Sequence, residues 1–208
     1  MSIPGTTSPP PYRPSPGDRV GLWIFIIGGL AITATTAVFA AIRITEILGP
    51  SPTPVDVQFA GLPAEVPAGS NALALDVTSA TIQVTEMPAA SLFAGVAGPV
   101  LTTLVTAAIA ACLIALAISV MRGQIFSRRN SKLVVAAGFT GLLGFAAVNL
   151  FQTMLANGAL AWASGRELDN IVFSVQPGTY LLAAFVIALV SSVFVIGERM
   201  QRDTDGLV

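Results

Sequence analysis

The chain has 208 residues and a net charge of −1, and 54% of its residues are hydrophobic while only 10% are charged. Soluble proteins are about 25% charged, so this composition excludes an ordinary water-soluble fold, and the near-zero charge shows no footprint of direct nucleic-acid binding. Histidine is absent and Cys112 is the only cysteine, which excludes an internal disulfide and removes the commonest general base and imidazole metal ligand. We therefore expect a non-enzymatic protein that uses no cofactor and no metal.

The two ends of the chain are polar. Residues 1–19 are rich in proline, serine and glycine and have almost nothing to bury, so we predict a disordered, Pro-rich cytoplasmic tail. Residues 198–208 predict a second, shorter cytoplasmic tail.

Four stretches without Asp, Glu, Lys or Arg are long enough to cross a membrane, which takes about 20 apolar residues in a helix. They predict spans at about 20–42, 91–120, 133–156 and 179–196. The first is longer than the apolar region of a secretory signal, which is about 7–15 residues, so we interpret it as a retained anchor. The predicted fold is all-α and transmembrane, a four-helix polytopic bundle in which residues 20–197 form the membrane domain.

Residues 43–90, between the first two spans, form a predicted outer loop. Alternation of apolar and polar residues in 55–59 and 81–85 is typical of short β-strands, so we expect a small sheet packed on the membrane surface. Arg43 and Glu46 lie one helical turn apart and predict an interfacial ion pair that contributes little stability.

The turn at 122–132 joins the second and third spans. Gly123 is placed to end one helix in a left-handed conformation and Ser127 to cap the next, which predicts a tight helical hairpin with Phe126 pointing back into its interface. The cations of this turn predict either anchoring to the lipid bilayer or docking of a protein partner. The residues of this candidate cytoplasmic interaction turn are Arg122, Gly123, Phe126, Ser127, Arg128, Arg129, Asn130 and Lys132.

The distribution of cations predicts the orientation, because Lys and Arg are enriched on the cytoplasmic side of membrane proteins. When both termini and the 122–132 turn are cytoplasmic, every Lys and Arg lies inside except Arg43 and Arg166. We therefore predict a multi-pass protein of the cell membrane with both termini in the cytoplasm.

Asn149 and Gln152 are the strongest polar feature within the spans, and their spacing places both on one face of the third helix. Amides in such a position usually bond to a neighbouring helix, and we expect such a contact here; the alternative is contact with a substrate. Gly138, Gly141 and Gly144 form a strip of small residues that favours close approach of another helix. No acid or base lies within a span, which argues against a proton-coupled transporter.

The 123–130 stretch, followed by Gly138, resembles a family of bacterial four-span membrane proteins, domain-of-unknown-function family 2975. The four spans and the long first outer loop agree too, so the resemblance covers roughly residues 20–197. Members of that family are often encoded beside a small helix-turn-helix regulator, which implies a membrane partner for a cytoplasmic transcription factor and no enzymatic activity. The family's signature corresponds here to Gly123, Phe126, Ser127 and Asn130.

Three functions follow as hypotheses. The leading one is a membrane protein whose basic turn docks a cytoplasmic regulator. The alternative is an accessory subunit of a larger membrane protein complex, in which the spans pack laterally against other subunits. The third is a small transporter or channel, in which Asn149 and Gln152 would contact the substrate.

Overall fold

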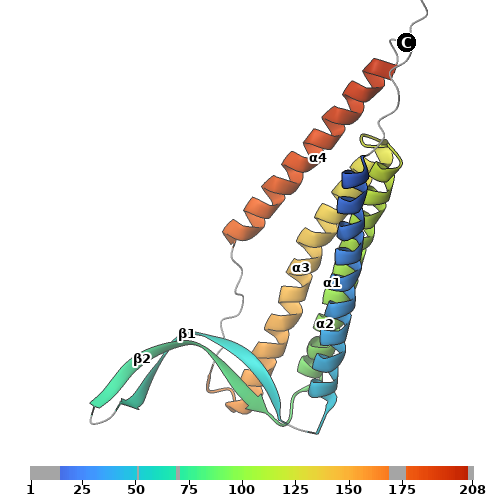
Figure 1. Cartoon of the computed structure of the whole chain (residues 1–208). Coiled ribbons are helices and arrows are strands. Elements are labelled where there is room, and N and C mark those ends of the chain that lie inside the picture. Colours follow the sequence, from blue (N-terminus) through green and yellow to red (C-terminus); the bar gives the residue numbers. More distant parts are fainter. Residues whose placement is uncertain (1–14, 51, 69–70, 169–176, 206–208) are drawn as a thin grey trace, which may run out of the picture. The chain divides into compact units, whose positions relative to one another are not determined.

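The structure of the chain, a computed structural model, describes residues 15–50, 52–68, 71–168 and 177–205. These residues form four α-helices and two β-strands, which Figure 1 shows in sequence colours. The elements in chain order are α1 (Pro16–Leu48), β1 (Thr53–Ala68), β2 (Asn71–Val84), α2 (Ala89–Met121), α3 (Arg128–Ala163) and α4 (Pro177–Asp205).

All four helices are long and apolar enough to cross a membrane. This confirms the predicted set of four long helices with a small β element between the first two. Each helix extends beyond its predicted span, because the sequence analysis ended a span where charges or helix breakers begin and a helix need not stop there. The largest difference at one boundary is at the end of α4, which continues to Asp205 instead of ending near residue 196.

The start of α1 corrects the predicted boundary of the N-terminal tail. Ser15 precedes the helix and Pro16 occupies its first position, where a missing N–H costs nothing. The Asp18 N–H donates to Ser15 Oγ at 3.2 Å, and the Ser15 N–H donates to the Asp18 carboxylate at 2.9 Å. This reciprocal capping box starts the helix inside the segment assigned to the tail. The rest of that predicted tail, residues 1–14, lies outside the described residues.

The chain divides into two compact units; α1, α2 and α3 contribute to both, and α4 belongs to one. Unit 1 comprises Met1–Thr36, Leu104–Gly144 and Pro177–Val208. Unit 2 comprises Ala37–Thr103 and Phe145–Gln176.

Unit 2 contains the β-hairpin. β1 and β2 pair antiparallel along their whole length, with a bulge between Gln58 and Leu62. The prediction of strands here is confirmed, but the strands have 16 and 14 residues and are not short. The sequence analysis missed this length because prolines in β1 resemble strand ends, whereas a two-stranded ribbon tolerates them at its outer edge.

The base of the hairpin packs on the end of α3. Val55, Val57 and Phe59 of β1 are buried together with Ala156, Ala159 and Leu160 of α3 and Val84 of β2. Alternate residues of a strand face the same side, so 55, 57 and 59 form one apolar face against the small side chains of the helix. This cluster is the largest buried apolar core among the described residues of unit 2.

Small residues set the helix packing in unit 1. Ile187 of α4 lies so close to Gly138 of α3 that a Cβ there would overlap it, and a Cβ at Gly144 would come within 2.5 Å of Val105 of α2. The prediction that this glycine strip permits close helix approach is confirmed at both positions.

Candidate functional site

The 122–132 turn begins where α2 ends. Gly123 has a φ of 80°, and its N–H donates to the Val120 carbonyl at 2.9 Å. The next N–H, that of Gln124, reaches back to the Ser119 carbonyl at 3.1 Å. These bonds satisfy carbonyls that the helix end would otherwise leave unpaired, so the predicted left-handed helix end is confirmed.

Ser127 starts α3. The Asn130 N–H donates to Ser127 Oγ at 3.2 Å, and the Ser131 N–H donates to the Ser127 carbonyl at 3.0 Å. A serine hydroxyl that accepts from the third residue of a helix is an N-cap, so the predicted capping role of Ser127 is confirmed.

Asn130 has a role that its sequence position did not reveal. Its side chain is fully buried, and Nδ2 donates to the carbonyls of Gln124 at 2.6 Å and Ile125 at 2.9 Å. Among the described residues, no donor reaches its Oδ1. A buried amide that holds two carbonyls of the turn fixes the path of the chain, and it presents nothing at the surface for a partner to contact.

Phe126 connects the turn to the end of α4. Its ring lies 5.8 Å from the ring of Phe194, measured between centroids. Its edge also covers Gly197, where a Cβ would overlap the ring. Phe126 was expected to point into the interface of the helical hairpin, whereas these contacts of its ring are with α4, a helix that was not predicted to meet this turn.

Glu198 makes polar contacts between the same end of α4 and the start of α3. Its Oε1 accepts from Arg128 Nε at 3.3 Å and its Oε2 accepts from Ser131 Oγ at 3.3 Å. The Glu198 side chain is mostly buried, although Arg128 is largely exposed. Residues 198–208 were predicted to form a polar tail, but α4 continues through Asp205. The first residue of that predicted tail, Glu198, makes the contact with the turn.

The exposed residues of the turn are four cations and Gln124. The four signature residues are engaged inside the turn or against α4, while Arg122, Arg128, Arg129 and Lys132 are all exposed. We call these four the basic rim. A basic rim on a hydrogen-bonded scaffold can attract an anionic surface, and its backbone does not have to be ordered when that surface binds.

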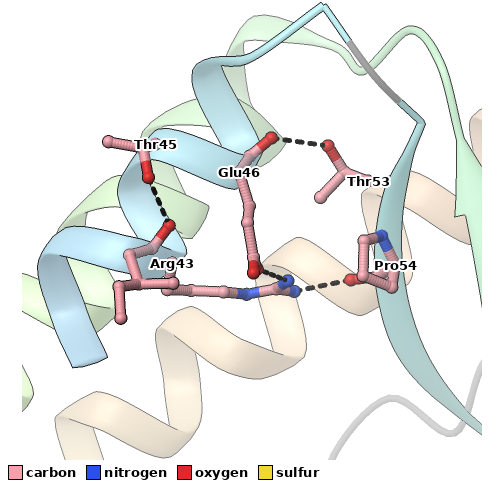
Figure 2. Close-up of polar contacts among 6 residues, drawn as sticks. Arg43, Thr45, Glu46, Thr53 and Pro54 are labelled. Carbon is pink, nitrogen blue, oxygen red and sulfur yellow. Dashed lines mark hydrogen bonds and ion pairs between the residues drawn. The ribbon is translucent and has the colours of Figure 1, made fainter.

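A second polar cluster lies in unit 2, where α1 meets the hairpin (Figure 2). Arg43 donates to the Glu46 carboxylate at 3.1 Å and, through its other terminal nitrogen, to the Pro54 carbonyl at 2.6 Å. Thr53 Oγ1 donates to the Glu46 carbonyl at 3.3 Å. The predicted ion pair of Arg43 and Glu46 is confirmed, and Arg43 also ties the end of α1 to the first residues of β1.

The two intramembrane amides differ in their surroundings. Asn149 is half-buried on α3, whereas Gln152 is exposed and is not buried against a neighbouring helix. Among the described residues, no three His, Cys, Asp or Glu side chains lie close enough together to hold a metal ion.

No family model, no curated protein and no solved structure matches this chain.

Proposed function

We propose that this chain is a non-enzymatic integral protein of the cell membrane that docks a cytoplasmic protein partner on its basic rim. Four helices of sufficient length and hydropathy support the membrane part of the proposal. Large apolar side chains are exposed on every helix, and lipid would cover them. Because Arg and Lys favour the cytoplasmic side, the orientation with the 122–132 turn and both termini inside fits the charges best.

The observation that carries the docking proposal is that some residues of the turn hold its structure while others are exposed. Gly123, Phe126, Ser127 and Asn130 are engaged internally, whereas the four cations of the basic rim are exposed. Such a rim fits an acidic protein surface. The resemblance to family 2975 suggests that a helix-turn-helix regulator provides that surface. Docking would contact the regulator's protein surface, so the membrane protein itself would not bind nucleic acid.

Lipid is the competing occupant of the basic rim. Each Lys or Arg near an anionic leaflet contributes about 1 kcal/mol of attraction, so anionic headgroups alone could account for the charges. The two occupants differ in one respect: a lipid surface needs only charge, whereas a protein partner also needs the cations in a defined arrangement.

The test is co-purification after gentle solubilisation. Arg129→Gln combined with Lys132→Gln removes two exposed cations of α3 and leaves the Arg128 contact to Glu198 intact. We expect loss of the partner with an unchanged unfolding temperature. Arg166→Gln on the predicted outer side is the matched control and should retain the partner. If the double variant still co-purifies with every cytoplasmic protein that the unchanged chain binds, the basic rim is not the docking surface.

A role as accessory subunit of a larger membrane complex is the second candidate, and α4 favours it. No residue is buried in the most apolar 18-residue window of α4. Its exposed residues include Leu181, Phe185 and Leu189, which recur at helical spacing and are available to another subunit. In the same purification, this role predicts membrane proteins that remain bound after the Arg129 and Lys132 changes.

A further inference from the structure

One cation of the basic rim already holds a carboxylate of the same chain. Arg128 is the first residue of α3, and its Nε donates to Oε1 of Glu198 on α4 at 3.3 Å. The Arg128 side chain is 74% exposed, whereas that of Glu198 is 17% exposed. The pair therefore joins a cation that another protein can reach to a carboxylate that is mostly buried.

Glu198 has contacts that do not involve Arg128. Its second oxygen, Oε2, accepts from Ser131 Oγ at 3.3 Å, and Ser131 is buried. The neighbouring Gly197 lies against the ring of Phe126. These contacts fix the end of α4 on the turn, so Arg128 can leave Glu198 while the carboxylate keeps its place.

Glu198 lowers the charge that the basic rim presents. Of the four rim cations, Arg128 is the one that forms an ion pair with another residue that the structure describes. Arg128 and Lys132 are four residues apart, so they lie on one face of α3. That face carries two cations, and Glu198 neutralises one of them while α4 stays in place.

The pairing of Arg128 with Glu198 opposes the binding of another carboxylate. A second carboxylate on the same guanidinium would lie close to Glu198, and the two negative charges would repel each other. An ion pair with a largely exposed member is also weak, so losing it changes an equilibrium constant by only about two- to five-fold. An acidic side chain of a partner can therefore take Arg128 from Glu198 at little cost.

We propose that Glu198 is an internal competitor of the docking partner: it binds Arg128 in the free protein and releases it to an acidic side chain of the partner. This inference rests on the proposed docking function and adds its regulation. Because coupling between two binding events is reciprocal, docking weakens the attachment of α4 to the turn. A movement of α4 that withdraws Glu198 strengthens docking by the same factor.

The test measures binding of a fluorescent hexaglutamate peptide to the full-length protein in phosphatidylcholine nanodiscs, which contain no anionic lipid. Glu198→Gln keeps an acceptor for Ser131 but removes the charge that binds Arg128. We expect it to bind the peptide about two- to five-fold more tightly than the unchanged chain. Asp203→Asn is the matched control, because it removes the charge of an exposed acid of the same helix. At physiological salt, where charges are screened over about 8 Å, it should change the affinity less than about 1.5-fold.

Combining both changes with Arg128→Gln separates the contact from a general effect of charge. Without Arg128, the gain from Glu198→Gln should disappear, because no cation is left to release. A gain that persists without Arg128, or that Asp203→Asn matches, would overturn the competition while docking stands. Glu198→Asp, which withdraws the carboxylate by one methylene group, should give a smaller gain in the same direction. If the peptide binds neither the unchanged chain nor Glu198→Gln, the docking function fails and the competition fails with it.

Discussion

Nδ2 of Asn130 lies 2.6 Å from the carbonyl oxygen of Gln124, so a side chain at the start of α3 closes the turn that leads into it. The same nitrogen also donates to Ile125. The amide therefore stabilises a path of the backbone that neither helix alone would determine.

Replacing Asn130 by Ala should destabilise the protein by about 1–3 kcal/mol, because the carbonyls of Gln124 and Ile125 lose their shared donor, and only the Gln124 carbonyl keeps a second one, Ser119 Oγ at 3.2 Å. The unpaired Oδ1 limits the loss, since its removal relieves an unsatisfied acceptor. Thermal unfolding in detergent would measure the change. Arg129→Ala, at the exposed neighbouring position, should leave the unfolding temperature within about a degree; equal effects of the two changes would contradict the role of the buried amide.

Gly197→Ala should loosen the attachment of α4 to the turn, since the new methyl group would overlap the Phe126 ring. Overpacking of this kind typically costs about 1–3 kcal/mol. A second change, Phe126→Leu, should restore part of the loss, which a double-mutant cycle of unfolding free energies would show. Gly28→Ala is the control, because nothing lies within 4 Å of a Cβ there, and it should be neutral or slightly stabilising.

Arg43→Gln should release the first residues of β1 from the end of α1, because Gln cannot donate to both Glu46 and the Pro54 carbonyl in this geometry. We expect amide hydrogen exchange at the start of β1 to accelerate about five-fold, which corresponds to about 1 kcal/mol in local opening. Glu46→Gln removes the ion pair and keeps the bond to Pro54, so it should have a smaller effect. Equal acceleration by both variants would show that the ion pair is the important contact.

The orientation predicts which positions an impermeant thiol reagent reaches in intact cells. In a Cys112→Ala background, cysteines at Gln58 and Gln83 of the hairpin should be labelled, while one at Gln124 of the turn should react only after permeabilisation. Gln124 is suitable for this labelling because its side chain is exposed, whereas that of Ser131 in the same turn is buried. Labelling at Gln124 in intact cells would reverse the proposed topology.

Gln152→Leu should leave the unfolding temperature unchanged or raise it slightly, because an exposed amide on an apolar helix gains by becoming apolar. Asn149→Leu should destabilise the protein by about 1 kcal/mol or less, since Asn149 is half-buried. Loss of solute flux with both variants, at unchanged stability, would instead support a conduit lined by these amides.

The sequence predicted the local features of this fold well. The helices, the glycine end at Gly123 and the cap at Ser127 all depend on residues within a few positions of one another. Apolar length and capping chemistry carry that information directly. The outer loop was predicted as β structure for the same reason, because alternation is a local signal.

Contacts between distant residues were not predictable in this way. Phe126 meets Gly197 and Arg128 meets Glu198 across about 70 positions, and no periodicity links such pairs. Asn130 was included in the candidate interaction turn, where it matches the signature of the family that the turn resembles. Its burial depends on the carbonyls that the turn happens to direct inward, and only the folded backbone reveals them.

The position of Glu198 after the hairpin, α2 and α3 in the sequence has a consequence for biosynthesis. A ribosome completes the hairpin, α2 and α3 before it makes the last turns of α4. The contacts of Phe126 and Ser131 with α4 therefore form only after those last turns have been synthesised. The hairpin needs only neighbouring sequence to pair and can form much earlier. A chain truncated before Phe194 would keep its hairpin and its Gly123 helix end but leave Phe126 without its contacts to Phe194 and Gly197, a difference that a membrane quality-control protease could recognise.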